Sequence, residues 1–135
     1  MSTKVFVNLP VKDLNKTKMA KEAKIDYDEE HDILYLYSGE KAKDSIEIDK
    51  FVIDISADNR IVGVEIFDAS VLLSKMSGFG INKENLSDVR GAKMQSYQSK
   101  ELFYVLVFLT LKVDGVEREI NLQVPAPTAV MVKTR

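Results

Sequence analysis

The stretch that decides the fold is residues 102–124, LFYVLVFLTLKVDGVEREINLQV, in which two strand-like runs flank Asp114-Gly115. An Asp-Gly pair favours a two-residue β-turn, because both residues tolerate positive backbone φ angles. Such a turn places Val113 opposite Val116 in an antiparallel hairpin. Because the run LFYVLVFL is apolar on both faces, we predict a central strand that is covered on both sides.

Residues 51–66 predict a second antiparallel hairpin, with a two-residue turn at Asp58-Asn59. This turn places Asp54 opposite Gly63 and Ser56 opposite Ile61. One face is wholly apolar and is predicted to be core: Phe51, Ile53, Ile55, Val62, Val64 and Ile66. The other face carries Val52, Asp54, Ser56, Ile61, Gly63 and Glu65.

A short helix is predicted after this hairpin, at about residues 69–77, because Ala69, Leu72, Leu73 and Met76 recur at helical spacing. Asp68 is suited to cap its start and Gly78 to end it. Strands outnumber helices and the connections are short, so the predicted class is α+β, predominantly antiparallel β-hairpins with this one helix packed on the sheet. We predict one α+β domain over residues 19–135, with hairpins plus helix in 24–77 and C-terminal antiparallel hairpins in 88–124.

The first 18 residues have a different character from the rest. Val5, Val7 and Leu9 alternate as in a strand that ends at Pro10. The pattern VFVNLPVKDL resembles the opening strand of glyoxalase/bleomycin-resistance proteins, and the resemblance stops at Lys18. Residues 1–18 are therefore either a leader or fusion segment or a native N-terminal strand.

Composition narrows the functional classes. The chain has 135 residues, of which 45% are hydrophobic and 30% charged, which is typical of one globular domain. It has no cysteine, which excludes disulfides, thiolate zinc sites and cysteine nucleophiles, and suits the cytoplasm. The longest apolar run, 102–109, is far shorter than the roughly 18 residues of a membrane span. A net charge of −2 argues against nucleic-acid binding.

Two carboxylates near Gly63 form the first candidate site. In the predicted register Asp54 and Glu65 are diagonal neighbours on the non-core face, and a glycine in mid-strand allows close approach by a backbone or a ligand. Such a pair can bind a cation or share a proton. The alternative is that both carboxylates bind backbone amides or lysines and stabilise packing.

The second candidate is the acidic turn from Asp28 to Asp32, which contains the single histidine, His31. It is either an oxygen-rich metal site with one imidazole or a solvated turn. Nearby, Tyr27, Tyr35 and Tyr37 are predicted to form an aromatic strip, which is either a binding surface or ordinary half-buried sheet. We predict no catalytic residue, no metal ligand set and no cofactor.

Residues 24–70 are similar to a prokaryotic family of small domains, domain-of-unknown-function family 2283. The matching elements are Tyr27-Asp28, Asp32-x-Leu34-Tyr35, Asp54-Ile55, Ile61-Val62-Gly63-Val64-Glu65-Ile66 and Ala69-Ser70. The resemblance implies a compact β-rich fold with a trailing helix and implies no activity. It points weakly to protein binding, because such domains look like partners in two-gene, toxin–antitoxin-like arrangements.

Two functional hypotheses follow from the sequence. The first is a non-enzymatic interaction module, a homo-oligomer or the partner of a small protein, which self-associates through sheet edges or the aromatic strip. The second is a metal- or small-ligand-binding protein, including a hydrolase, that uses Asp54 and Glu65 with Asp28, His31 or Asp32. The sequence identifies neither a ligand nor a partner.

Overall fold

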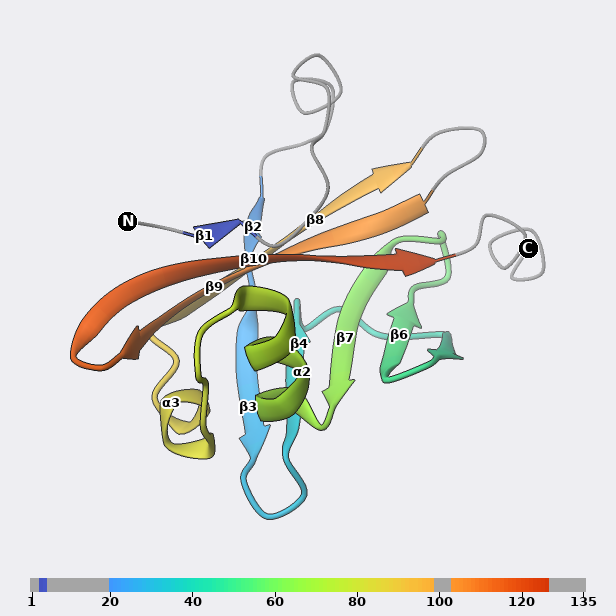
Figure 1. Ribbon diagram of the computed structural model, residues 1–135. Helices are drawn as coiled ribbons and strands as arrows, with labels where there is room; N and C mark the ends of the chain where they lie inside the picture. The colour runs from blue at the N-terminus through green and yellow to red at the C-terminus, as the bar shows by residue number, and fades with distance from the viewer. Residues whose placement is uncertain (1–2, 5–19, 99–102, 127–135) are drawn as a thin grey trace.

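The computed structural model describes residues 3–4, 20–98 and 103–126, which form two five-stranded sheets and two helices (Figure 1). The long-strand sheet has the order β1-β10-β9-β8-β2, with β1 Thr3–Lys4, β2 Lys21–Glu22, β8 Gly91–Gln98, β9 Phe103–Val113 and β10 Val116–Ala126. The short-strand sheet has the order β3-β4-β7-β6-β5, with β3 Lys24–Asp28, β4 Ile33–Tyr37, β5 Asp44–Ile48, β6 Phe51–Ile55 and β7 Ile61–Phe67. The helices α2 (Ala69–Ser77) and α3 (Lys83–Ser87) follow β7. Apart from the two-residue β1, neighbouring strands are antiparallel, and the predicted α+β class is confirmed.

The β9–β10 hairpin has the predicted turn. Asp114 and Gly115 both have positive φ, 54° and 77°, as a tight hairpin turn requires. Val113 lies opposite Val116, as the sequence predicts. β9 runs between β10 and β8, and its consecutive residues 104–107 are all buried, so β9 is a central strand covered on both faces.

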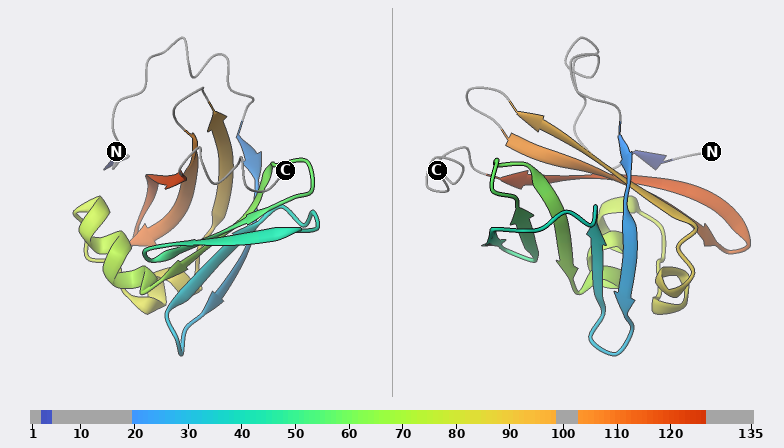
Figure 2. Two further views of the ribbon diagram at one scale, coloured as in Figure 1. Left: turned by 90° about the vertical axis from the view of Figure 1, so that its right-hand side faces the viewer. Right: turned by 180° about the vertical axis from the view of Figure 1, so that it is seen from behind.

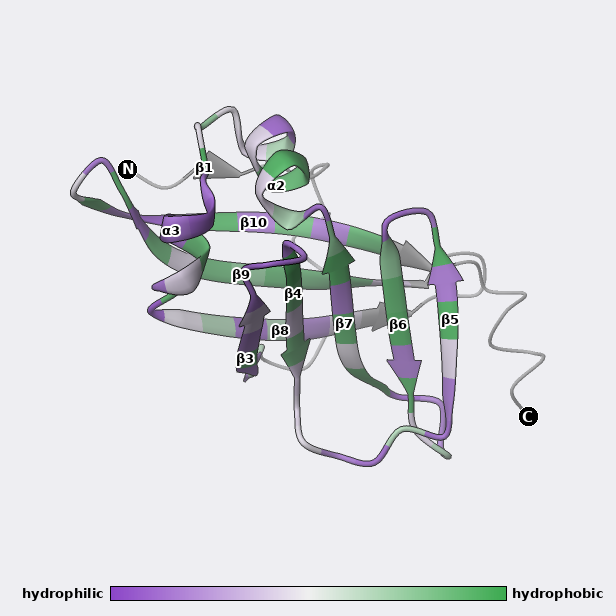
Figure 3. Ribbon diagram, turned by 90° about the horizontal axis from the view of Figure 1, so that it is seen from below, coloured by the Kyte–Doolittle hydropathy of each residue, from purple (hydrophilic) through white to green (hydrophobic). Residues whose placement is uncertain are grey.

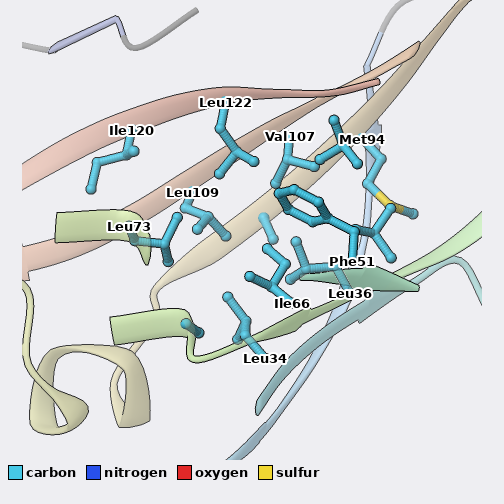
Figure 4. Close-up of a cluster of buried hydrophobic side chains, with 14 of the residues drawn as sticks. Leu34, Leu36, Phe51, Ile66, Leu73, Met94, Val107, Leu109, Ile120 and Leu122 are labelled. Atoms are coloured by element: carbon cyan, nitrogen blue, oxygen red, sulfur yellow. The ribbon is translucent and has the colours of Figure 1, made fainter. Parts of the chain in front are cut away.

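The core lies between the two sheets, whose strands cross one another (Figure 3). Figure 4 shows side chains from both sheets and from α2 meeting there: Leu34, Leu36, Phe51, Ile66, Leu73, Met94, Val107, Leu109, Ile120 and Leu122. In β4 and β6 every second residue is buried, which is the alternation of a sheet with one face in the core. Full burial of one such aliphatic side chain contributes about 1.5–3 kcal/mol.

The two sheets are joined along one side by a single stretch of chain. β2 belongs to the long-strand sheet and β3 to the short-strand sheet, with only Ala23 between them. The Ala23 N–H donates a hydrogen bond of 2.9 Å to the carbonyl oxygen of Ala92 in β8. β5 is the last strand on the other side of the short-strand sheet (Figures 2 and 3).

The β6–β7 turn differs from the prediction, but most of the register does not. The Ser56 N–H bonds to the carbonyl oxygen of Arg60, so the turn spans three residues, and Asn59 adopts a left-handed φ of 63°. Ile61 therefore pairs with Ile55 and packs in the core, and the predicted pairing with Ser56 was wrong. A β-bulge then adds one residue to β7, which restores the predicted pairing of Asp54 with Gly63.

The helix α2 has the predicted span, but its start is stabilised differently. Asp68 precedes the helix in a left-handed conformation, and its side chain makes no capping bond. Its carboxylate instead accepts a 2.7 Å hydrogen bond from Lys50 Nζ, so the predicted role of Asp68 as a side-chain cap was wrong. Gly78 ends the helix with a φ of 80°, as predicted. α3 is a second helix, begun by Asn82 in a capping box.

Some sequence predictions fall outside the described residues. Of residues 1–18 only Thr3 and Lys4 are described, and they pair with Ile120 and Asn121. The sequence also predicts a tight turn at 99–100 and a short edge strand at 128–132, and both lie wholly outside the described residues. In the described ranges, neither helix has the length and apolar character that crossing a membrane requires.

Candidate functional site

The outer face of the short-strand sheet, opposite the core, carries the first candidate site. Asp54, Gly63 and Glu65 all lie on it (Figure 3 views this sheet from its outer side). Tyr35 and Ser45 lie there as well, because Tyr35 pairs with Glu65 and Ser45 with Asp54. The structure therefore brings together the three residues that the sequence singled out near Gly63 and adds two hydroxyl groups.

Asp54 connects the strands around it. Its Oδ2 accepts a 2.7 Å hydrogen bond from the Tyr35 hydroxyl of β4, and its Oδ1 accepts one of 2.7 Å from the Ser45 hydroxyl of β5. β7 lies between β4 and β6 in the sheet order, so the bond to Tyr35 passes over β7. Both carboxylate oxygens are thus bound within the chain.

Gly63 is the residue of β7 over which this bond passes. A Cβ at position 63 would lie 2.8 Å from both Asp54 Oδ2 and the Tyr35 hydroxyl oxygen, which is closer than real Cβ contacts allow. The Tyr35 ring is also stacked on Tyr37, with ring centroids 4.8 Å apart. The space above Gly63 is therefore filled by the protein's own side chains.

Glu65 lies beside this bond and is half-buried. Burial raises the pKa of the Glu65 carboxyl, and the charge of Asp54 raises it further. The pKa of Tyr35 is also raised, first by burial and then by its hydrogen bond to Asp54. Asp54 and Glu65 are close enough to repel one another, which is the arrangement predicted from the sequence.

Asp32 lies away from this pair and has a structural role. It is buried, and its carboxylate accepts hydrogen bonds from the Tyr27 hydroxyl (2.6 Å), from the Ser70 N–H (3.0 Å) and from the Ser70 hydroxyl (2.7 Å). Its carbonyl oxygen accepts from the Ala69 N–H. Burial alone raises the pKa of Asp32, but these hydrogen bonds outweigh it, and the pKa is lowered. Asp32 therefore caps the start of α2, although it lies 38 residues before Ser70 in the sequence.

Asp28 is exposed in the β3–β4 turn. Its Oδ2 lies 2.8 Å from His31 Nδ1, and the hydrogen bond to His31 is the main cause of its lowered pKa. Within the residues that the structure describes, no group of three His, Cys, Asp or Glu side chains is placed to hold a metal ion. Asp28 pairs with Ile33 at one end of β4 and Gly63 with Tyr37 at the other, so the turn and the Gly63 region are separate features.

The predicted aromatic strip is divided between two faces, so the interpretation of one strip was wrong. Tyr27 packs against the core and donates its hydroxyl hydrogen to Asp32. Tyr35 and Tyr37 stack on the outer face. Strand alternation accounts for the division, because Tyr27 pairs with the buried Leu34.

The free edge of β5 is a feature that the sequence alone does not reveal. Ile48 and Phe51 flank the two-residue β5–β6 turn and pair with one another, so they form a hydrogen-bonded pair. The alternation along an antiparallel strand then directs the backbone N–H and C=O groups of Ser45 and Glu47 away from β6. Among the described residues no strand lies on that side. The signal in the sequence is the alternation of Ser45, Ile46, Glu47 and Ile48 before a two-residue turn.

Comparison with known proteins finds a family model that part of the chain matches. Residues 24–70 match the model of a family described as "Protein of unknown function (DUF2283)". The match runs from the start of β3 to the first turn of α2, and so contains the short-strand sheet with Asp28, Asp32, Asp54, Gly63 and Glu65. The suspected family resemblance is thereby confirmed for this segment.

Two curated proteins are similar to parts of the chain. A protein of Methanosarcina mazei named "Putative hypoxanthine phosphoribosyltransferase" is 37% identical over 68 residues, which are 50% of this chain and 50% of that protein. An uncharacterised protein of Methanocaldococcus jannaschii is 42% identical over 52 residues, 38% of this chain and 45% of that protein. The chain thus spans half or less of the length of these relatives, and no solved structure matches it.

Proposed function

We propose that this protein is a non-enzymatic interaction module that self-associates through the free edge of β5. The observation that carries the proposal is the row of outward backbone groups at Ser45 and Glu47, on a strand that ends its sheet. Such an edge is a template for pairing with another strand. Ile46 and Ile48 are half-buried against the core from the same strand, which holds the edge in an extended conformation.

The other sheet edges are less suited to pairing. β3 ends the short-strand sheet on its other side, but it continues from β2, which pairs with β8. β10 is bordered by β1 at Ile120 and Asn121, and its Pro125 has no N–H to donate. Proline is one of the means by which proteins protect an edge. β5 contains no proline, and its exposed Asp44 and Glu47 are charges that pairing at this edge must accommodate.

A proline substitution tests the proposal without breaking the fold. The alternation of the β5–β6 ladder directs the Glu47 N–H away from β6, and no described strand lies on that side, so Glu47→Pro removes a donor needed only for edge pairing. We expect light scattering to give a multiple of the 15.2 kDa chain mass for the native protein and the single-chain mass for Glu47→Pro.

Glu47→Ala is the matched control, because it removes the same side chain and keeps the N–H; its mass should equal that of the native protein. Circular dichroism spectra should be the same for all three proteins. A native protein that remains at the single-chain mass at high concentration would contradict the proposal.

The second proposal is that Asp54 and Glu65 bind a cation or a small ligand, and it has less support. Both oxygens of Asp54 already accept hydrogen bonds, and the space above Gly63 is occupied by Tyr35. The raised pKa of Glu65 favours it, because a half-buried carboxyl beside another carboxylate would be stabilised by a bound cation. Calorimetric titration with divalent cations tests this proposal; a heat signal that Glu65→Gln removes would support it. The phosphoribosyltransferase name of one relative carries no proposal, because the match covers half of that protein.

A further inference from the structure

We infer that the partner of the β5 edge is β5 of a second copy, paired antiparallel about a two-fold axis through Ile46. This inference rests on the proposed self-association and adds its geometry. About this axis all five residues of β5, Asp44–Ile48, pair with the same five residues of the other copy. The two short-strand sheets then form one continuous sheet of ten strands.

The hydrogen-bonding pattern of β5 fits this register. The outward N–H and C=O groups belong to Ser45 and Glu47, and the register pairs Ser45 of one copy with Glu47 of the other. These residues therefore form two hydrogen-bonded pairs related by the axis. Ile46 meets Ile46 of the second copy between them as a non-hydrogen-bonded pair, in which side chains approach most closely. Two half-buried isoleucines thus extend the cores of the two copies towards one another.

The charges beside the strand are complementary in the same register. Lys43 precedes β5 and Asp49 follows it, so the axis brings Lys43 of each copy to the end of the paired strands where Asp49 of the other copy lies. Both side chains are exposed, and neither residue belongs to the strand: the Lys43 N–H bonds to the carbonyl oxygen of Ile55, and Asp49 lies in the β5–β6 turn. Asp44 lies opposite Ile48, so no two like charges are directly opposed, and the two Glu47 side chains are diagonal neighbours across the axis. An axis through Ser45 would overlap only three residues of each strand.

Cysteine cross-linking tests the register, because the native chain has no cysteine. At a non-hydrogen-bonded pair the Cα atoms lie about 4.5 Å apart, within the range of about 4.4–6.8 Å that a disulfide spans. Ile46→Cys is therefore expected to form a disulfide dimer under mild oxidation. Ser45→Cys is the matched control, because the two Ser45 positions are offset by two residues along the strand and lie too far apart.

The outcomes distinguish this inference from the proposed function. Cross-linking of Ile46→Cys but not of Ser45→Cys supports the register. Cross-linking of Ser45→Cys alone, or of neither variant while sedimentation shows a dimer, overturns the register and leaves self-association standing. A single-chain mass in sedimentation of the native protein overturns both.

A charge exchange provides a test that does not need substitution of Ile46. Lys43→Asp is expected to raise the dimer dissociation constant several-fold, because it brings like charges together at both ends of the paired strands. The double variant with Lys43→Asp and Asp49→Lys should recover most of that affinity. Asp49→Lys alone is the control for strain in the turn, where Asp49 has a φ of 53°. A double variant no tighter than Lys43→Asp would overturn the register.

Discussion

The centre of the outer face and the free edge of β5 belong to one sheet but differ in how their polar groups are satisfied. At the centre, each oxygen of Asp54 has a hydrogen-bond donor, and Gly63 leaves room for Tyr35 to reach it. At the edge, the backbone groups of Ser45 and Glu47 face away from the sheet. Asp54 and Asp32, which the sequence makes conspicuous, thus form hydrogen bonds between distant segments of the chain. The proposed interaction site is identified instead by backbone groups at the edge that pair with no described strand.

The largest expected effect is that of Asp32→Ala on stability. Asp32 is a buried residue that joins the β3–β4 turn to α2, and its loss leaves Tyr27 and Ser70 without their acceptor. We expect urea denaturation to show a loss of about 2–4 kcal/mol in the free energy of unfolding.

This loss should depend on pH. The pKa of Asp32 is lower in the folded protein than its ordinary value of 3.8, so its contribution is present above that value and disappears as the pH falls through the folded pKa. The exposed Asp28 is the control, and Asp28→Ala should change stability by less than about 0.5 kcal/mol. Equal effects of the two substitutions would contradict the assigned roles.

Asp54→Ala is expected to have the next largest effect, a loss of about 1–3 kcal/mol, because Tyr35 and Ser45 lose their acceptor. Thermal or urea denaturation measures it. The dimer dissociation constant should change much less than it does for Glu47→Pro, since the backbone of β5 is intact. If Asp54→Ala kept the stability of the protein but abolished self-association, Asp54 would belong to the interaction site and would not have the structural role assigned to it.

Gly63→Ala has two opposing effects. The added methyl group separates Tyr35 from Asp54, which is unfavourable, whereas replacing a glycine within a strand is favourable. We therefore expect a net loss of about 1 kcal/mol or less in the free energy of unfolding. The decisive measurement is the same substitution in a protein that already carries Asp54→Ala and Tyr35→Ala. There the methyl group meets neither side chain, and Gly63→Ala should become stabilising. An unchanged sign would show that a contact other than Tyr35–Asp54 excludes the side chain.

Much of the fold follows from the sequence because its turns are local. Asp114-Gly115 sets the β9–β10 register directly, and the position of Gly78 marks the end of α2. The β6–β7 turn is a different case. Its three-residue loop and the bulge in β7 compensate one another, so a wrong turn length still gives the right pairing of Asp54 with Gly63. The arrangement of the sheets depends on contacts between distant segments and could not be derived from local patterns.

The candidate site was only partly predictable for the same reason. The proximity of Asp54, Gly63 and Glu65 follows from one hairpin, and the structure confirms it. The role of Asp32 could not be predicted in this way, because its hydrogen-bond partner Ser70 is 38 residues away in the sequence. The β5 edge could not be recognised before the order of strands was known, since an edge is a property of the whole sheet.

Glu65→Gln should have the smallest effect, and it is a gain. Because the folded pKa of Glu65 lies above its ordinary value of 4.5, the folded state binds more protons between these two values, and ionisation of Glu65 destabilises the fold as the pH rises. At pH 7, Gln should therefore raise the free energy of unfolding, and the gain should vanish near pH 3. Denaturation curves at both pH values check this, and a loss at pH 7 would contradict the assigned electrostatics.

Amide hydrogen exchange of Ser45 and Glu47, measured by NMR at low and high protein concentration, tests the central claim most directly. In a single chain these two amides face solvent and exchange fast, whereas the Ile46 and Ile48 amides are bonded to β6. Self-association through β5 predicts that protection of Ser45 and Glu47 increases with concentration while that of Ile46 changes little. Fast exchange of Ser45 and Glu47 at every concentration would contradict the claim that β5 is the interaction edge.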